Sequence, residues 1–133
     1  MPSFARALLV WLLLMAVETI HGVLRNLFLA PAVGDFQARQ IGVFIGSVLI
    51  LTIAVLTIRW IRPSSVGSTL GIGAFWLMLT LAFEFFLGRA LGRSWGAMRA
   101  DYDLTRGGYL SIGMVVLALA PWIAARMRHK DEF

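Results

Sequence analysis

The chain contains no cysteine, which excludes disulfide bonds, thiolate catalysis and cysteine-based metal sites. Charge is also scarce, since 14% of the residues are charged and 59% are hydrophobic, and the mean hydropathy is +0.82. The three stretches 41–58, 66–83 and 109–125 lack any charged side chain, and each is about long enough to cross a bilayer core. A soluble fold of 133 residues would have to bury all three stretches, and too few polar residues would remain to cover them. We therefore expect an integral membrane protein.

Several functional signatures are missing as well. The sequence has no soluble domain that could bind nucleic acid, although its net charge is +5. It has no nucleophile elbow, no phosphate loop after a strand and no two-histidine metal helix. The sequence therefore assigns no catalytic residue and no cofactor, and it does not decide whether the protein is an enzyme.

Four apolar segments predict four transmembrane helices, at 4–29, 36–61, 66–95 and 105–127. Turn-forming residues separate them, at 31–34, 63–65 and 101–108. A cleaved signal peptide is the alternative for the first segment, but no small-x-small cleavage site follows its apolar run. We expect one all-α domain over 1–133, a four-helix membrane bundle of two tandem helical hairpins with both chain ends on the same side.

In the two halves of the chain, 1–66 and 67–133, several charged residues and glycines recur in the same order. Glu18 precedes Glu84 by 66 residues, and after a one-residue insertion Arg39 and Gly46 correspond to Arg106 and Gly113. An internal repeat of this kind would arrange two hairpins of equal orientation around an axis along the membrane normal. Chance recurrence is the alternative, because the lipid-facing residues hardly match.

Basic residues do not decide the orientation in the membrane. Six of them lie on the side of the chain ends and six on the opposite side. The second group alternates with Asp35, Asp101 and Asp103, whereas the first is mostly unpaired in the sequence. We therefore expect a multi-pass protein of a bacterial-type inner membrane, in contact with membrane lipids and with both termini cytoplasmic.

Glu18, His21, Gly22 and Arg25 follow the spacing i, i+3, i+4, i+7 and so lie along one face of the first helix. Glu18 comes twelve residues after Arg6, about 18 Å along the axis, which places it within the hydrocarbon region. A carboxylate at that depth costs several kcal/mol unless it is paired, hydrogen-bonded or protonated. Glu18, His21 and Arg25 are therefore candidate binding residues. A buried glutamate–arginine pair that fixes helix packing is the structural alternative.

Glu84 repeats this situation in the third helix, after eighteen uncharged residues. Gly88, Gly92 and Gly96 follow it at four-residue intervals and predict a small-residue stripe that another helix approaches closely. The stripe should carry Glu84 into that contact, so Glu84 is a further candidate binding residue.

The second helix offers a matching small-residue pair, Gly42 and Gly46, on the face that also carries Arg39. Arg89 and Arg93 point away from the face of the third-helix glutamate. We expect their side chains to extend to lipid head groups.

The segment 94–109 is the most irregular and polar part of the chain. Of Asp101 and Asp103, one is expected to cap the fourth helix, and the other to pair with Arg39 or Arg106. These four residues complete the candidate binding set. A lid over the polar site is a less favoured interpretation of this segment than a simple capped loop.

A metal site is one alternative. Glu18-Thr-Ile-His21 is a Glu-x-x-His motif, which dinuclear carboxylate sites in four-helix bundles use twice, together with two more glutamates. A homodimer would supply Glu18, His21 and Glu84 twice as metal ligands, although the motif is short and Arg25 repels cations. Four helices also make a narrow bundle, so we expect a homo-oligomer or a subunit of a membrane complex.

Three functions follow from these patterns. The favoured one is binding or translocation of a proton, a cation or a small solute by the intramembrane glutamate, histidine and arginine residues. The alternatives are an accessory or scaffold subunit, and a membrane-embedded carboxylate–histidine metal site or enzyme. A glutamate in the first of four helices resembles the small multidrug-resistance transporters at that position alone. His21, Glu84 and the acidic third connection depart from their pattern, so no function is carried over.

Overall fold

A computed structural model describes residues 2–130 of the chain. Over these residues the protein consists of helices and short turns, without a strand. Four helical segments are long and apolar enough to span a membrane, Ser3–Val33, Asp35–Ile61, Val66–Ala90 and Leu110–Arg128. The expected fold class, an all-α membrane protein with four transmembrane helices in a bundle, is confirmed.

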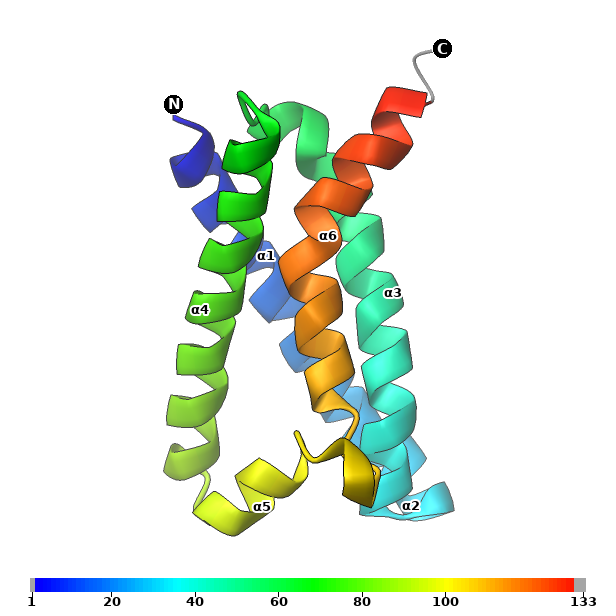
Figure 1. The fold of residues 1–133 in the computed structure, drawn as a ribbon. Coiled ribbons are helices and arrows are strands. Elements are labelled where there is room, and N and C mark those ends of the chain that lie inside the picture. Colours follow the sequence, from blue (N-terminus) through cyan, green and yellow to red (C-terminus); the bar gives the residue numbers. More distant parts are fainter. Residues whose placement is uncertain (1, 131–133) are drawn as a thin grey trace.

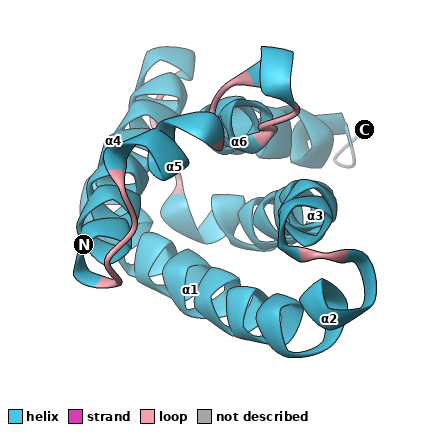
Figure 2. Ribbon diagram, turned by 90° about the horizontal axis from the view of Figure 1, so that it is seen from below, coloured by secondary structure: helices cyan, strands magenta, loops and turns pink. Residues whose placement is uncertain are grey.

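The four long helices are α1 (Ser3–Leu24), α3 (Asp35–Ile61), α4 (Val66–Ala90) and α6 (Leu110–Lys130). They follow one another around the bundle in the order α1, α3, α6, α4, as seen along the bundle axis (Figure 2). Helices α1 and α4 run one way and α3 and α6 the other, so α1 begins and α6 ends at the same end of the bundle (Figure 1). The short helix α5 (Trp95–Ala100) crosses the opposite end.

The first span is longer than expected, because it passes through Pro31. A π-helical turn, η1 (Arg25–Leu29), follows α1 and leads into the short helix α2 (Ala30–Val33). A proline ring clashes with the carbonyl four residues earlier in a regular α-helix, and the wider π-turn relieves that clash. Gly34, with φ +90°, then ends the span, and α3 begins at Asp35.

The third helix ends at Ala90, so the prediction that it continues to residue 95 is wrong. Gly92 has φ +81°, its N–H donates to the Arg89 carbonyl, and the Arg93 N–H donates to the Gly88 carbonyl. This is the hydrogen-bond pattern with which a left-handed glycine ends a helix. The expected stripe of Gly88, Gly92 and Gly96 therefore does not exist as one helix face.

The fourth helix begins at Leu110, five residues later than expected. The Asp103 carboxylate accepts from the Thr105 N–H at 3.1 Å and caps a short 3₁₀ helix, η2 (Leu104–Arg106). Gly107, with φ +81°, ends that turn. The cap expected for the fourth helix thus belongs to the turn before it.

The apolar core fills the half of the bundle that contains the chain ends. Trp76 of α4 is fully buried there, and its Nε1–H donates to the Ala7 carbonyl of α1 at 2.9 Å. Trp11 of α1 donates to Thr80 Oγ1 at 3.0 Å and packs edge-on against Phe83. These contacts join α1 to α4 along the N-terminal half of α1, and the polar residues of α1 lie beyond them.

Candidate functional site

A cavity of about 420 Å³ lies between the four long helices, in the half of the bundle nearer α5. Each of α1, α3, α4 and α6 contributes to its walls, and the connection between α4 and α6 adds Arg93, Met98, Asp101 and Tyr102. The polar and ionisable side chains on its lining include Glu18, His21, Arg25, Arg39, Gln40, Glu84, Arg93, Asp101 and Tyr102. Among the described residues, the buried polar ones are Thr69 and Thr80, so the ionisable groups border the cavity while being only partly buried.

The polar face of α1 packs directly on two glycines of α3. A Cβ on Gly46 would lie 2.9 Å from Glu18 Oε2, and a Cβ on Gly42 would lie 3.0 Å from Arg25 Cδ and 3.6 Å from His21 Cε1. Glycine at both positions leaves room for these side chains, which would have to shift if a Cβ were added. The expected small-residue pair is used, but its partner is the polar stripe of α1.

Glu18 and His21 are close to each other, and each has a side-chain atom without a hydrogen-bond partner. His21 Nδ1 lies 3.5 Å from Glu18 Oε2, and their side chains are 13% and 24% exposed, respectively. Glu18 Oε1, His21 Nε2 and Arg25 Nε are buried and have no hydrogen-bond partner within residues 2–130. Three residues that line the cavity on one helix face thus each keep a buried polar atom without a hydrogen-bond partner.

Glu84 reaches the same cavity from α4. Within the described part of the chain its carboxylate makes no hydrogen bond and no ion pair, although Arg25, Arg39 and Asp101 act on it electrostatically. Glu84 and Glu18 also interact with each other through their charges. The structure therefore brings together, in one cavity, the two glutamates that the sequence placed 66 residues apart.

Asp101 ties the segment around α5 to the bundle. Its Oδ2 accepts from Arg93 Nη1 at 2.7 Å and from Arg39 Nη1 at 3.2 Å, and Arg39 also donates to Asp35 at 3.1 Å. The expected pairing of an aspartate with Arg39 is confirmed. The expectation that Arg93 extends to head groups is wrong, because the turn after α4 points its guanidinium back to Asp101. Arg89 stacks on the Trp95 ring instead.

Asp103 and Arg106 lie away from the cavity lining. Asp103 Oδ2 is 3.6 Å from Arg106 Nε, and the Arg106 side chain is 80% exposed. The hydrogen bond from the Thr105 hydroxyl is the main reason why the pKa of Asp103 lies below its usual value. These two candidate binding residues therefore belong to the turn at η2.

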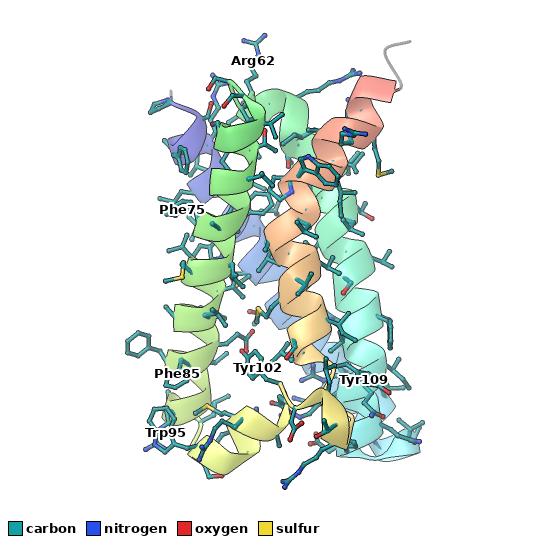
Figure 3. All side chains as sticks on the ribbon, viewed as in Figure 1. Arg62, Phe75, Phe85, Trp95, Tyr102 and Tyr109 are labelled. Atoms are coloured by element: carbon teal, nitrogen blue, oxygen red, sulfur yellow. The ribbon has the colours of Figure 1, made fainter. Side chains whose placement is uncertain are left out.

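Tyr102 was missed as a site residue by sequence reasoning. It lies just above α5 and lines the cavity (Figure 3). Burial raises the pKa of its phenol to about 12, with smaller contributions from the charges of Glu84 and Asp101. The one signal in the sequence is its position between Asp101 and Asp103, which does not by itself indicate the direction of the ring.

The proposed metal ligands are not gathered into a chelating group. Among residues 2–128, whose side chains the structure describes, no set of three or more histidine, aspartate or glutamate side chains is close enough together to hold a metal ion. Glu18 and His21 are adjacent, but Glu84 does not join them as a third ligand. The side chains of one chain therefore do not fit the metal hypothesis.

The fold and the cavity together define a small multi-pass membrane protein with a polar cavity inside its helical bundle. The chain matches no protein-family model, no curated protein and no solved structure. No function is transferred to it from a relative.

Proposed function

We propose that this protein binds or translocates a proton, a cation or a small solute at the cavity, through the carboxylates of Glu18 and Glu84. One observation carries the proposal. Two acid side chains from different helices border one cavity, and neither is ion-paired with an arginine within residues 2–130. A glutamate kept only for packing would be expected to form an ion pair with Arg25, because an unpaired charge within the membrane is costly.

His21 and Arg25 supply the neighbouring chemistry. His21 Nδ1 lies 3.5 Å from Glu18 Oε2, so a protonated imidazole would stabilise the carboxylate, and histidine changes its charge in the physiological range of pH. Arg25 adds a permanent positive charge to the same helix face. Together they make the charge state of Glu18 responsive to what occupies the cavity.

A flux assay tests the proposal. Proteoliposomes that contain a pH-sensitive dye are given an acid pulse, with and without a gradient of sodium or potassium ions. We expect wild-type protein to carry a measurable flux, and Glu18→Gln and Glu84→Gln each to reduce it about tenfold or more. Asp103→Asn is the matched control, since it makes the same change of charge outside the cavity and should leave the flux unchanged. Equal flux in all four proteins would contradict the proposal.

A scaffold role is the second candidate, and one observation favours it. Glu18 and Arg25 pack closely on Gly46 and Gly42, as side chains that determine helix packing would. In that case the amide substitutions would disturb assembly rather than flux, and a larger membrane complex would co-purify with the protein.

The remaining aspects of the proposal are separately testable. A homo-oligomer would be detected by native mass spectrometry of the protein in nanodiscs, and a monomer would contradict it. Cytoplasmic termini in a bacterial-type inner membrane would be detected by reporter fusions to each chain end. The internal repeat of 1–66 and 67–133 is a proposal that distant homologues of a single half would support.

A further inference from the structure

Two opposite charges on the first span, Glu18 of α1 and Arg25 of η1, pack on different glycines of α3. The Glu18 carboxylate lies against Gly46 and the guanidinium of Arg25 against Gly42, one helical turn nearer to α5. The four residues from Gly42 to Gly46 correspond to about 6 Å along the axis. No ion pair joins Glu18 to Arg25 within the described chain, so the acid and the base face the cavity as separate groups.

Both charged groups retain unused hydrogen-bonding capacity at buried atoms. Glu18 Oε1 is an acceptor without a donor, and Arg25 Nε is a donor without an acceptor. A single positive ligand would satisfy Glu18 and leave Arg25, whereas a single negative ligand would do the reverse. A molecule with an ammonium group and a carboxylate group a few ångström apart satisfies both with charge-assisted hydrogen bonds.

Apolar side chains line another part of the cavity. Met15, Phe83, Met114 and Leu117 lie on its walls, beside the two charged groups. Methionine side chains adapt to irregular shapes, so these walls suit an aliphatic or aromatic side chain. A volume of about 420 Å³ lies near the lower end of the range for small-molecule sites, about 300–1,000 Å³.

We propose that the cavity binds a zwitterionic α-amino acid with an apolar side chain. Its ammonium group donates to the Glu18 carboxylate, its carboxylate accepts from the Arg25 guanidinium, and its side chain packs between Met15 and Phe83. This proposal rests on the proposed function, since it names the class of solute for the same cavity. Glu84, which lines the cavity from the neighbouring helix α4, offers a second acceptor for the ammonium group.

Three probes of one shape separate the contributions of the two charges. L-leucine carries both charges, isopentylamine carries the positive one alone, and 4-methylpentanoate carries the negative one alone. Binding is measured on the detergent-solubilised full chain, as the shift of the thermal unfolding midpoint with ligand concentration. We expect a saturable upward shift with L-leucine, and an apparent affinity at least about tenfold weaker for each analogue.

Substitutions assign the contacts. Glu18→Gln and Arg25→Gln should each weaken L-leucine binding about tenfold or more, whereas Arg99→Gln, at an exposed position outside the cavity lining, should not. Circular dichroism confirms that each variant is folded. If Arg25→Gln fails to fold, Arg25→Lys replaces it, because it keeps the charge but loses the Nε donor and should still weaken binding.

The outcomes distinguish this inference from the proposed function. Equal binding of isopentylamine and L-leucine, unaffected by Arg25→Gln, would overturn the inference of a zwitterionic ligand and leave a cation site at Glu18. Flux that depends on Glu18 without any binding of L-leucine would also overturn the zwitterion and leave the proposed function in place. Binding and flux that are both unaffected by Glu18→Gln would overturn both.

Discussion

Replacing Gly46 by alanine tests how closely Glu18 is held against α3. The new Cβ would lie 2.9 Å from Glu18 Oε2, 3.4 Å from Oε1 and 3.5 Å from Cδ. Carbon–oxygen contacts of this kind normally begin at about 3.3 Å. The carboxylate must therefore move by roughly half an ångström or rotate away from His21.

The expected change in stability is the sum of two opposite effects. Added volume in a packed site costs about 1–3 kcal/mol. Alanine is favoured over glycine inside a helix by about 1 kcal/mol. The free energy of unfolding should thus fall by about 0–2 kcal/mol, so the fold survives while the position of the Glu18 carboxylate changes.

Reversible unfolding in mixed detergent micelles measures this difference. Gly22→Ala is the matched control on α1, because its Cβ would lie 4.0 Å from the nearest atom, Arg25 Nη2, and it should gain up to about 1 kcal/mol. The double variant Glu18→Ala/Gly46→Ala should show that the penalty at Gly46 disappears once the carboxylate is gone. The packing of Glu18 against α3 would be refuted if Gly46→Ala raised the free energy of unfolding as much as Gly22→Ala does. The double variant would then show no coupling energy between positions 18 and 46.

Three further substitutions probe other parts of the structure. Asp101→Asn should lower stability by about 1–3 kcal/mol, because it breaks a partly buried bridge to two arginines, and hydrogen exchange around α5 should then increase. Tyr102→Phe should remove the phenol that titrates near pH 12 in an absorbance titration. With Tyr102 present, stability should fall as the pH rises from about 10 to about 12, because the unfolded chain loses that proton first. Gly73→Ala should disrupt the crossing of α4 and α6, since its Cβ would overlap the carbonyl oxygen of Ala118, and a normally stable variant would contradict that crossing.

The membrane spans could be predicted from the sequence because they depend on local composition. Uncharged runs of sufficient length located three of them, and a shorter apolar run located the first. Helix α3 begins one residue before its predicted start. The spacing of Glu18, His21 and Arg25 placed them on one face, and the structure brings that face to the cavity. Helical periodicity is a property of consecutive residues, so these predictions needed no tertiary information.

The segment between α4 and α6 could not be predicted in the same way. Gly92 and Ser94 carry the signals of a helix end and a helix start, but apolar residues continue past them and suggested a longer helix. The ion pair of Arg93 with Asp101 and the inward position of Tyr102 depend on how the segment folds back. That path also requires Gly108, where a Cβ would overlap the Ala100 carbonyl oxygen. Such contacts are tertiary and leave no periodic pattern.

The free energy of unfolding of wild-type, Glu18→Gln and Glu84→Gln proteins tests most directly whether these carboxylates serve binding rather than packing. Uncharged amides cost less to place in a membrane cavity than carboxylates without a counter-charge. The account predicts that both variants are at least as stable as wild type and have lost the stabilisation by bound solute. Collapse of both proteins, or of their assembly, would contradict it and show that the glutamates hold the helices together.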